Sequence, residues 1–199
     1  MGKRKRNSLS RKTGTRHYRP VCWISSEGHT ERDYFDMNVF RNLGVSIRFP
    51  RDVHPQRVHP AAVLKRLQKS MRDNPLRKSD EAWVVVDVDD WSKEDFDDLL
   101  KWSRSDPRHH VAISNPKFEL FLVMHFGKGN GCTTPARVDD ALGRCMPGYD
   151  KRLSRDRFGV SEVAQAIENA RAKRLGCDSA IPDPGMTDVY KLADSLLER

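Results

Sequence analysis

The chain has 199 residues, a net charge of +8 and a hydrophobic share of 37%. This length supports one sizeable core and is too short for two full domains with a linker. No stretch approaches the roughly 18 consecutive apolar residues of a membrane helix, and the first residues lack the apolar segment of a secretory signal. We therefore expect a soluble cytoplasmic protein with no membrane contact.

The first 19 residues form a basic arm. They contain eight basic residues and no acid, so they account for the whole net charge. Because the arm has few large apolar groups, it cannot bury enough surface to fold alone, and we predict that it is flexible. Its composition favours contacts to nucleic-acid phosphates, with a solubilising tail or an acidic protein partner as alternatives. The residues assigned to nucleic acid are Lys3, Arg4, Lys5, Arg6, Arg11 and Lys12.

After the arm, strand-like runs alternate with helical periodicity. Residues 21–25 are a short continuous apolar run, typical of a buried parallel strand, and a polar segment ends it. Thr30 is the expected N-cap of a helix over residues 31–43, because apolar side chains recur there at helical spacing before a glycine. Residues 45–49 alternate as a second strand.

The next segments continue the alternation. Proline begins a helical pattern over residues 60–71, and residues 82–88 are the strongest strand of the chain. Ser92 is the expected N-cap of another helix, a shorter strand covers residues 111–114, and residues 118–126 are apolar enough for a buried helix. This order predicts an α/β fold with a mostly parallel sheet of about four strands and helices on both faces.

The pattern changes after residue 127. Helical segments are expected at residues 138–142, 160–175 and 189–197, with loops between them. We therefore divide the chain into the arm at residues 1–19, a catalytic core at residues 20–126 and a helical extension at residues 127–199 that packs on the core.

Acidic residues gather where two of the predicted strands end. Glu27 follows the first strand, and Asp87, Asp89 and Asp90 follow the apolar run at residues 83–86 of the strongest strand. Clustered carboxylates at buried strand ends repel one another and are costly to desolvate, so a cation is expected to neutralise them. Oxygen ligands favour Mg²⁺, with Mn²⁺ as a substitute. A strand-ending turn capped by charges is the alternative for the second group.

Further polar residues fall on the same edge of the predicted sheet. Ser114 and Asn115 end the strand at residues 111–114, and ligands of such sheets bind beyond the carboxyl ends of the strands. Lys117 follows them and is either a phosphate-neutralising group or a solvated helix residue. Glu119 lies in a strongly apolar segment, where a carboxylate must pair with a base or face the site. His125, in the same segment, is expected to be a hydrogen-bonded core histidine.

The order of these motifs resembles a known family. Ser-Glu-Gly-x-Thr-Glu over residues 26–31 and Asp-x-Asp-Asp over residues 87–90 are similar to the Toprim fold of topoisomerases, primases and OLD-type nucleases. With Ser-Asn-Pro-x-Phe-Glu-Leu over residues 114–120, Leu-x-x-His-Phe over residues 122–126 and Met-Pro-Gly-Tyr-x-Lys over residues 146–151, the set resembles the RloB-like proteins of bacterial defence loci.

The resemblance implies a function and assigns residues to it. It implies a Toprim-type nuclease of phage defence by abortive infection, encoded beside an ABC/AAA-type ATPase, that cleaves RNA such as transfer RNA, or DNA. Glu27 matches the glutamate that acts as general base or metal ligand, and Asp87 and Asp89 match the metal-binding aspartates. In the resulting assignment Glu31 and Asp90 complete the metal ligands and Lys117 is catalytic. Substrate-contacting or supporting residues are Ser114, Asn115, Glu119, Tyr149 and Lys151.

A second hypothesis remains open. A catalytically silent subunit of a defence complex would keep the fold and use the arm to bind nucleic acid or the ATPase partner. A topoisomerase reaction through Tyr149 is disfavoured, because the chain leaves no room for the large domain that carries the tyrosine in those enzymes. A homo-oligomer is a further expectation.

Overall fold

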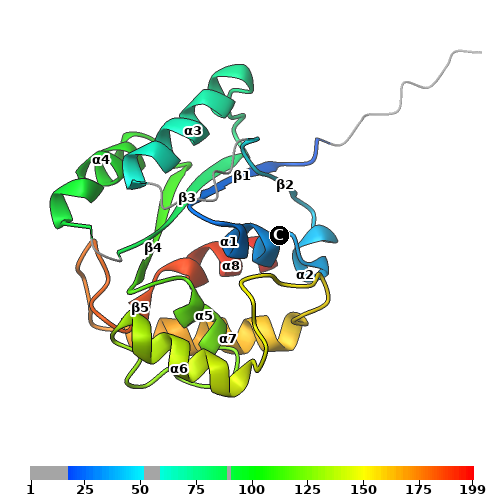
Figure 1. Cartoon of the computed structure of the whole chain (residues 1–199). Helices are drawn as coiled ribbons and strands as arrows, with labels where there is room; N and C mark the ends of the chain where they lie inside the picture. Colours follow the sequence, from blue (N-terminus) through cyan, green and yellow to red (C-terminus); the bar gives the residue numbers. More distant parts are fainter. Residues whose placement is uncertain (1–17, 52–58, 89–90) are drawn as a thin grey trace, which may run out of the picture.

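The computed structural model describes residues 18–51, 59–88 and 91–199. Within these residues, five strands form one sheet in the order β2-β1-β3-β4-β5 (Figure 1). The strands are β1 (Val21–Ser26), β2 (Ser46–Arg48), β3 (Glu81–Asp87), β4 (His109–Asn115) and β5 (Met186–Thr187). The helices of the same residues are α1 (His29–Phe35), α2 (Asn38–Arg41), α3 (Pro60–Asp73), α4 (Asp97–Ser105), α5 (Glu119–Val123), α6 (Pro135–Cys145), α7 (Val160–Arg174) and α8 (Val189–Leu197).

The expected α/β architecture is confirmed. Strands β2, β1, β3 and β4 are parallel, so their carboxyl ends lie at one edge of the sheet. The fifth strand was not predicted, because two residues are too few to show a strand period. It comes from the C-terminal segment and pairs antiparallel with β4, with Ser114 opposite Thr187. The C-terminal segment therefore extends the sheet as well as covering it.

Helices cover both faces of the sheet (Figure 1). Side chains of β1 alternate between the two cores: Cys22 and Ile24 pack beneath α1, α5, α7 and α8, whereas Val21 and Trp23 pack beneath α3 and α4. This alternation is the period of two expected for a strand that is buried on both sides. It leaves the residue after β1, Glu27, at the carboxyl edge.

The first predicted helix is broken. The sequence indicated one helix over residues 31–43, but α1 ends at Phe35 and α2 begins at Asn38. Met37 between them has an extended backbone and a fully buried side chain. The Asn38 amide donates to Arg155 O at 2.9 Å, so a contact with a distant segment holds the break. The prediction of Thr30 as N-cap was wrong, because the cap position belongs to Gly28.

Other local predictions hold with changed limits. Ser92 and Asp95 form the expected capping box at a 3₁₀ turn (Lys93–Phe96) before α4. The helix expected at residues 138–142 is longer, since Thr134 caps it and Pro135 begins it. The buried helix expected at residues 118–126 is α-helical only over α5.

His125 is a core histidine, as predicted. It is 8% exposed, and its ring stacks on Phe158 with centroids 3.9 Å apart. Its Nδ1 lies 3.0 Å from Phe121 O, which can only accept, so Nδ1 carries the proton and Nε2 accepts from the Tyr34 hydroxyl at 3.1 Å. The ring therefore joins α1 and α5 to the C-terminal segment.

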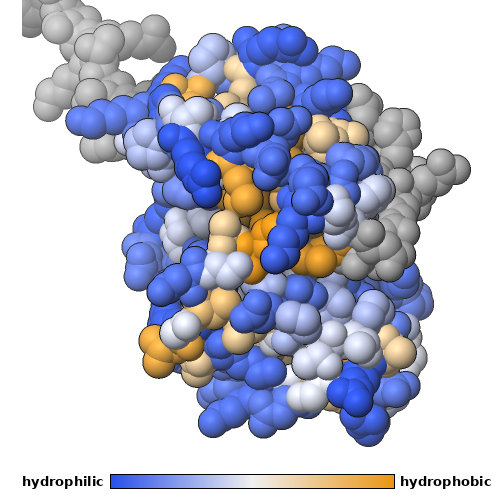
Figure 2. Space-filling view, turned by 90° about the vertical axis from the view of Figure 1, so that its left-hand side faces the viewer, coloured by the Kyte–Doolittle hydropathy of each residue, from blue (hydrophilic) through white to orange (hydrophobic). Residues whose placement is uncertain are grey.

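The surface is largely hydrophilic on the side of α4 and β4. Figure 2 shows a hydrophobic area near the middle of this side, surrounded by hydrophilic residues. Leu100, Val111 and Ile181, from α4, β4 and the loop before β5, are only partly buried against the core beneath α3 and α4. In the described part of the chain, no helix is long and apolar enough to cross a membrane.

Candidate active site

The candidate site lies where β1 and β3 end side by side. Ser26 of β1 lies opposite Val85 of β3, so Glu27 and Asp87 lie close to each other at the carboxyl edge of the sheet. The Asp87 amide donates to Glu27 Oε1 at 3.1 Å. The prediction that the acids of these two strand ends meet is confirmed for this pair. Asp89 and Asp90 lie outside the described residues.

Two helices add a carboxylate each. Glu31 stands in the first turn of α1 and Glu119 in the first turn of α5, where partial positive charge at a helix N-terminus favours an acid. Both side chains are buried, at 5% and 8% exposure. A Cβ on Gly28 would lie 3.1 Å from Glu31 Oε2. Glycine at this turn therefore gives the Glu31 carboxylate room beside the strand end.

Burial and neighbouring charge raise the pKa of two of these carboxylates, Asp87 and Glu31. Burial raises the pKa of Asp87 well above its ordinary value, and of the nearby charges Glu31 makes the largest contribution. Glu27 and Glu119 raise the Asp87 pKa further, while a backbone hydrogen bond from Phe118 opposes the rise. Burial also raises the pKa of Glu31 to about 7, with the charge of Glu119 adding to the effect. Three carboxylates thus lie within electrostatic reach of Asp87.

One oxygen of this cluster lacks a hydrogen bond. Asp87 Oδ1 is shielded from solvent and has no hydrogen-bond partner among the described residues. A buried carboxylate oxygen without a partner is costly unless it is protonated or bound to a cation. Within the described parts of the chain, no group of three His, Cys, Asp or Glu side chains is already arranged to hold a metal ion.

Residues 149–151 close one side of the cluster. Thr30 of α1 donates to Lys151 O at 3.0 Å and lies 3.1 Å from the Tyr149 hydroxyl. The positive charge of Lys151 favours ionised Glu31 and lowers its pKa. Burial, with the charges of Glu119 and Glu31, raises the pKa of Tyr149, so the phenol stays neutral and can donate a hydrogen bond. The predicted Tyr149 and Lys151 are therefore at the site.

Three other predicted residues contact the C-terminal half of the chain instead. Lys117 pairs with Asp139 of α6 at 2.5 Å. The buried Ser114 hydroxyl lies 2.9 Å from that of Thr187 in β5. Asn115 Nδ2 donates to the Pro182 carbonyl at 2.8 Å. Their described contacts hold α6, β5 and the loop before β5 against the sheet.

A comparison with family models identifies the chain. The model described as RloB-like protein matches residues 22–196, which is most of the chain. The chain belongs to the RloB-like family. Comparison with curated proteins and with solved structures gave no match. The mixed sheet of this RloB-like protein, with helices on both faces, is consistent with a Toprim-like α/β fold.

Sequence reasoning missed Arg66 of this RloB-like protein. Its Nη2 donates to the Ser26 carbonyl at 2.6 Å, one residue before Glu27, so α3 is tied to the end of β1. Arg66 is one of several cations in a predicted crossover helix, and nothing in the helical period distinguishes it. Only the packing of α3 on the sheet directs it to the candidate site.

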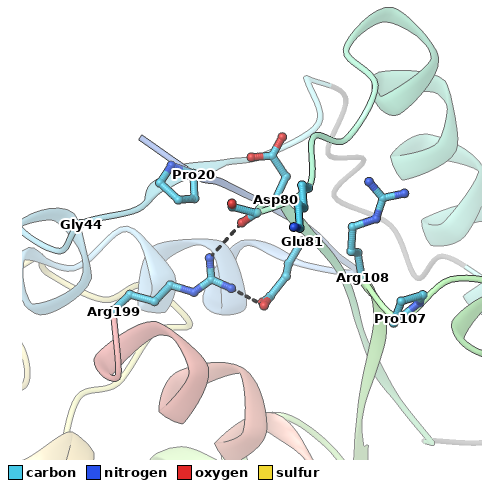
Figure 3. A pocket seen from close by; sticks show the side chains of 9 residues that line it. Pro20, Gly44, Asp80, Glu81, Pro107, Arg108 and Arg199 are labelled. Carbon is cyan, nitrogen blue, oxygen red and sulfur yellow. Dashed lines mark hydrogen bonds and ion pairs between the residues drawn. The ribbon is translucent and has the colours of Figure 1, made fainter. Parts of the chain in front are cut away.

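The opposite edge of the sheet holds a separate cavity of about 540 Å³ (Figure 3). Pro20, Asp80, Glu81 and Arg108 are among its lining residues, and Arg199 pairs with Glu81 across it. Arg199 also donates to the Ser79 carbonyl at 3.4 Å. These acids have protein partners, unlike Asp87 Oδ1, so we assign this cavity no part in the chemistry.

Proposed function

We propose that this RloB-like protein is a metal-dependent nuclease that hydrolyses phosphodiester bonds in RNA such as transfer RNA, or in DNA. The observation that carries the proposal is the buried Asp87 Oδ1, which has no partner among the described residues and lies amid three further carboxylates. A fold gains nothing from such an arrangement unless a cation or a substrate uses it.

The donor chemistry fits Mg²⁺, with Mn²⁺ as a substitute. The available atoms are carboxylate oxygens, which hard divalent cations prefer, and Mg²⁺ binds through one or two carboxylates while keeping several waters. Asp87 and Glu27 would hold the ion. Its positive charge would also attract the nearby Glu31 carboxylate. A divalent cation bound there would polarise a phosphate oxygen and lower the pKa of water.

The protein groups supply the remaining requirements. Glu27 would orient a water or accept its proton, and its hydrogen bond from the Asp87 amide supports this role by fixing one carboxylate oxygen. The Lys151 ammonium would contact a substrate phosphate beside Glu31, and the neutral Tyr149 hydroxyl would join it by exchanging its hydrogen bond to Thr30 for one to the phosphate. Lys117 remains a catalytic candidate by motif, although its described contact is with Asp139.

The biological setting rests on family membership. RloB-like proteins resemble effectors of phage defence, and we propose that this chain acts in abortive infection with an ABC/AAA-type ATPase partner. The proposal is supported by the match over residues 22–196.

A cleavage assay tests the nuclease. Purified protein is incubated with transfer RNA and with plasmid DNA in Mg²⁺, Mn²⁺ or EDTA, alone and with the neighbouring ATPase. Cutting in metal that EDTA abolishes is the expected result, and the substrate that is cut names the activity. Absence of cutting in every combination would contradict the proposal and favour the silent binding subunit.

A further inference from the structure

A basic groove leads toward the candidate site along the β2 side of the sheet. It has a volume of about 690 Å³ and lies between β2 with the segment after it and helix α3. A smaller hollow, lined by Ser26 and Arg32, shares Phe49, Pro50 and Arg66 with the groove. Arg66 lines both hollows and donates to the carbonyl of Ser26, the residue before Glu27, so the path along the groove ends at the carboxyl end of β1.

Cations stand on both walls of this path. Arg48 and Arg51 come from β2 and the segment after it, and Arg66 and Lys69 come from α3. Asp73 is the acidic residue among the groove's described lining. The lining therefore carries a net positive charge. It adjoins the carboxylates, whose negative charge would repel a phosphate unless a cation is bound there.

Three of these cations have no acidic partner among the residues that the structure describes. Arg48, Arg51 and Lys69 make no ion pair within the part of the chain that the structure describes, although Arg41, Arg108 and Arg174 each pair with an aspartate. An unneutralised cation in a groove is available for a phosphate, and its counterions are released when one binds.

Aromatic rings hold two of the guanidinium groups in place. Arg48 lies over Trp23 with its central carbon 5.8 Å from the ring, and Arg32 lies over Phe49 at 5.2 Å. Arg66 is held by the Ser26 carbonyl at 2.6 Å. These contacts order the arginine side chains before a ligand arrives, which lowers the entropy cost of binding.

We propose that this groove binds the phosphate backbone of a single nucleic-acid strand and guides it to Glu27 and Asp87. A single strand can lie between the two walls and meet cations from both, whereas a duplex is a convex rod that contacts mainly the rims. The inference rests on the proposed nuclease function, because it specifies the substrate of that site as single-stranded at the point of entry.

Binding is measured on the full chain in EDTA, so that affinity is read without cleavage. The variant Arg51→Glu/Lys69→Glu reverses one charge on each wall. The control Lys101→Glu/Arg104→Glu makes the same change of net charge on exposed residues of α4 outside the groove. Probes are a labelled single-stranded oligonucleotide, a duplex of the same sequence and inorganic phosphate, followed by anisotropy or competition over a range of salt.

We expect the wall variant to bind the single strand at least tenfold more weakly, and the control to stay within about twofold of wild type. The slope of log affinity against log salt should fall by about 0.7 for each phosphate that the variant no longer neutralises. Equal weakening in both variants, unchanged binding in the wall variant, or tighter binding of the duplex by wild type would overturn the groove proposal.

The same variants separate this inference from the nuclease proposal. Groove-dependent binding by a wild type that cuts nothing in any metal would support the groove and contradict the nuclease. Metal-dependent cutting that the wall variant retains at wild-type kcat/KM would support the nuclease and contradict the groove.

Discussion

The two ends of β3 carry acids in opposite states. Before the strand, Asp80 accepts hydrogen bonds from the amides of Val21 and Arg77, each at 2.8 Å, and from the Tyr18 hydroxyl. Although desolvation opposes them, these bonds lower the Asp80 pKa. At the last residue of the strand, Asp87 has one shielded oxygen without a partner among the described residues, and burial raises its pKa.

The comparison separates an acid whose charge is used inside the fold from acids to which the proposed function assigns a cation. Asp80 joins the start of β3 to β1 and to the turn before β3, so its charge is used inside the protein. Asp87 is repelled by the neighbouring carboxylates, so its ionisation opposes folding, and in the proposed function a bound cation would remove this cost. Two aspartates seven positions apart, one just before β3 and one at its last residue, thus have different roles because their surroundings differ.

The substitution Asp87→Asn, at the carboxyl end of β3, should have the largest effect of the changes predicted for the two ends of this strand. We expect cleavage to fall below detection, because the amide lacks the charge that holds a cation. At pH 8 the unfolded wild-type chain carries an ionised Asp87, and folding buries that carboxylate or protonates it at a cost in free energy. Asparagine avoids this cost, so the metal-free variant should unfold at a higher temperature than wild type at pH 8. Assays of cleavage and thermal unfolding check both effects. Retained cleavage, or a variant less stable at pH 8, would contradict the role given to Asp87.

The pH dependence of stability tests Glu31. Its folded pKa of about 7 lies above the ordinary value of 4.5, so the folded protein binds more protons than the unfolded chain between these values. The free energy of unfolding should therefore fall as pH rises from about 4.5 to 7, by up to about 3 kcal/mol.

Glu31→Gln removes the group that titrates. In EDTA, the free energy of unfolding measured by denaturant should fall less with rising pH for this variant than for wild type. In a second series with Mg²⁺ in place of EDTA, the ion should stabilise wild type most at pH 8. Parallel curves for the two proteins would show that Glu31 does not titrate as described.

At the other end of the strand, Asp80→Ala should act on stability alone. It leaves the buried Val21 amide and the Arg77 amide without their acceptor, at a cost of about 2 kcal/mol in the free energy of unfolding. Cleavage per folded molecule should stay at the wild-type level. A loss of cleavage in fully folded Asp80→Ala protein would mean that the two ends of β3 do not have separate roles.

The basic arm gives the smallest expected effect. Residues 1–17 of it lie outside the described residues, and its nucleic-acid contacts stay a prediction from composition. Deleting residues 1–17, which keeps the Tyr18 bond to Asp80, should weaken binding of nucleic acid and reduce its salt dependence, while leaving the groove's preference for a single strand. Filter binding over a salt series measures both. Unchanged affinity and slope would remove the arm from the interface.

Local sequence signals predicted much of the fold because they act within a few residues. The apolar runs of β1 and β3, the proline at the start of α3 and the capping box at Ser92 each depend on neighbouring residues. The sequence did not predict the features of the fold that depend on contacts between distant residues. The break at Met37 depends on burial and on Arg155, more than a hundred residues away, and β5 exists because β4 offers it a partner.

The candidate site divides in the same way. The sequence by itself determined that Glu27 and Asp87 follow strands, because strand ends are set by local pattern, and parallel pairing then brings those ends to one edge. Only the tertiary structure decided that Glu31 and Glu119 join them from two helices, that Lys117 pairs with Asp139, and that Arg66 reaches Ser26. The physical reason is that side-chain direction across packed elements depends on register and helix placement, which no local pattern encodes.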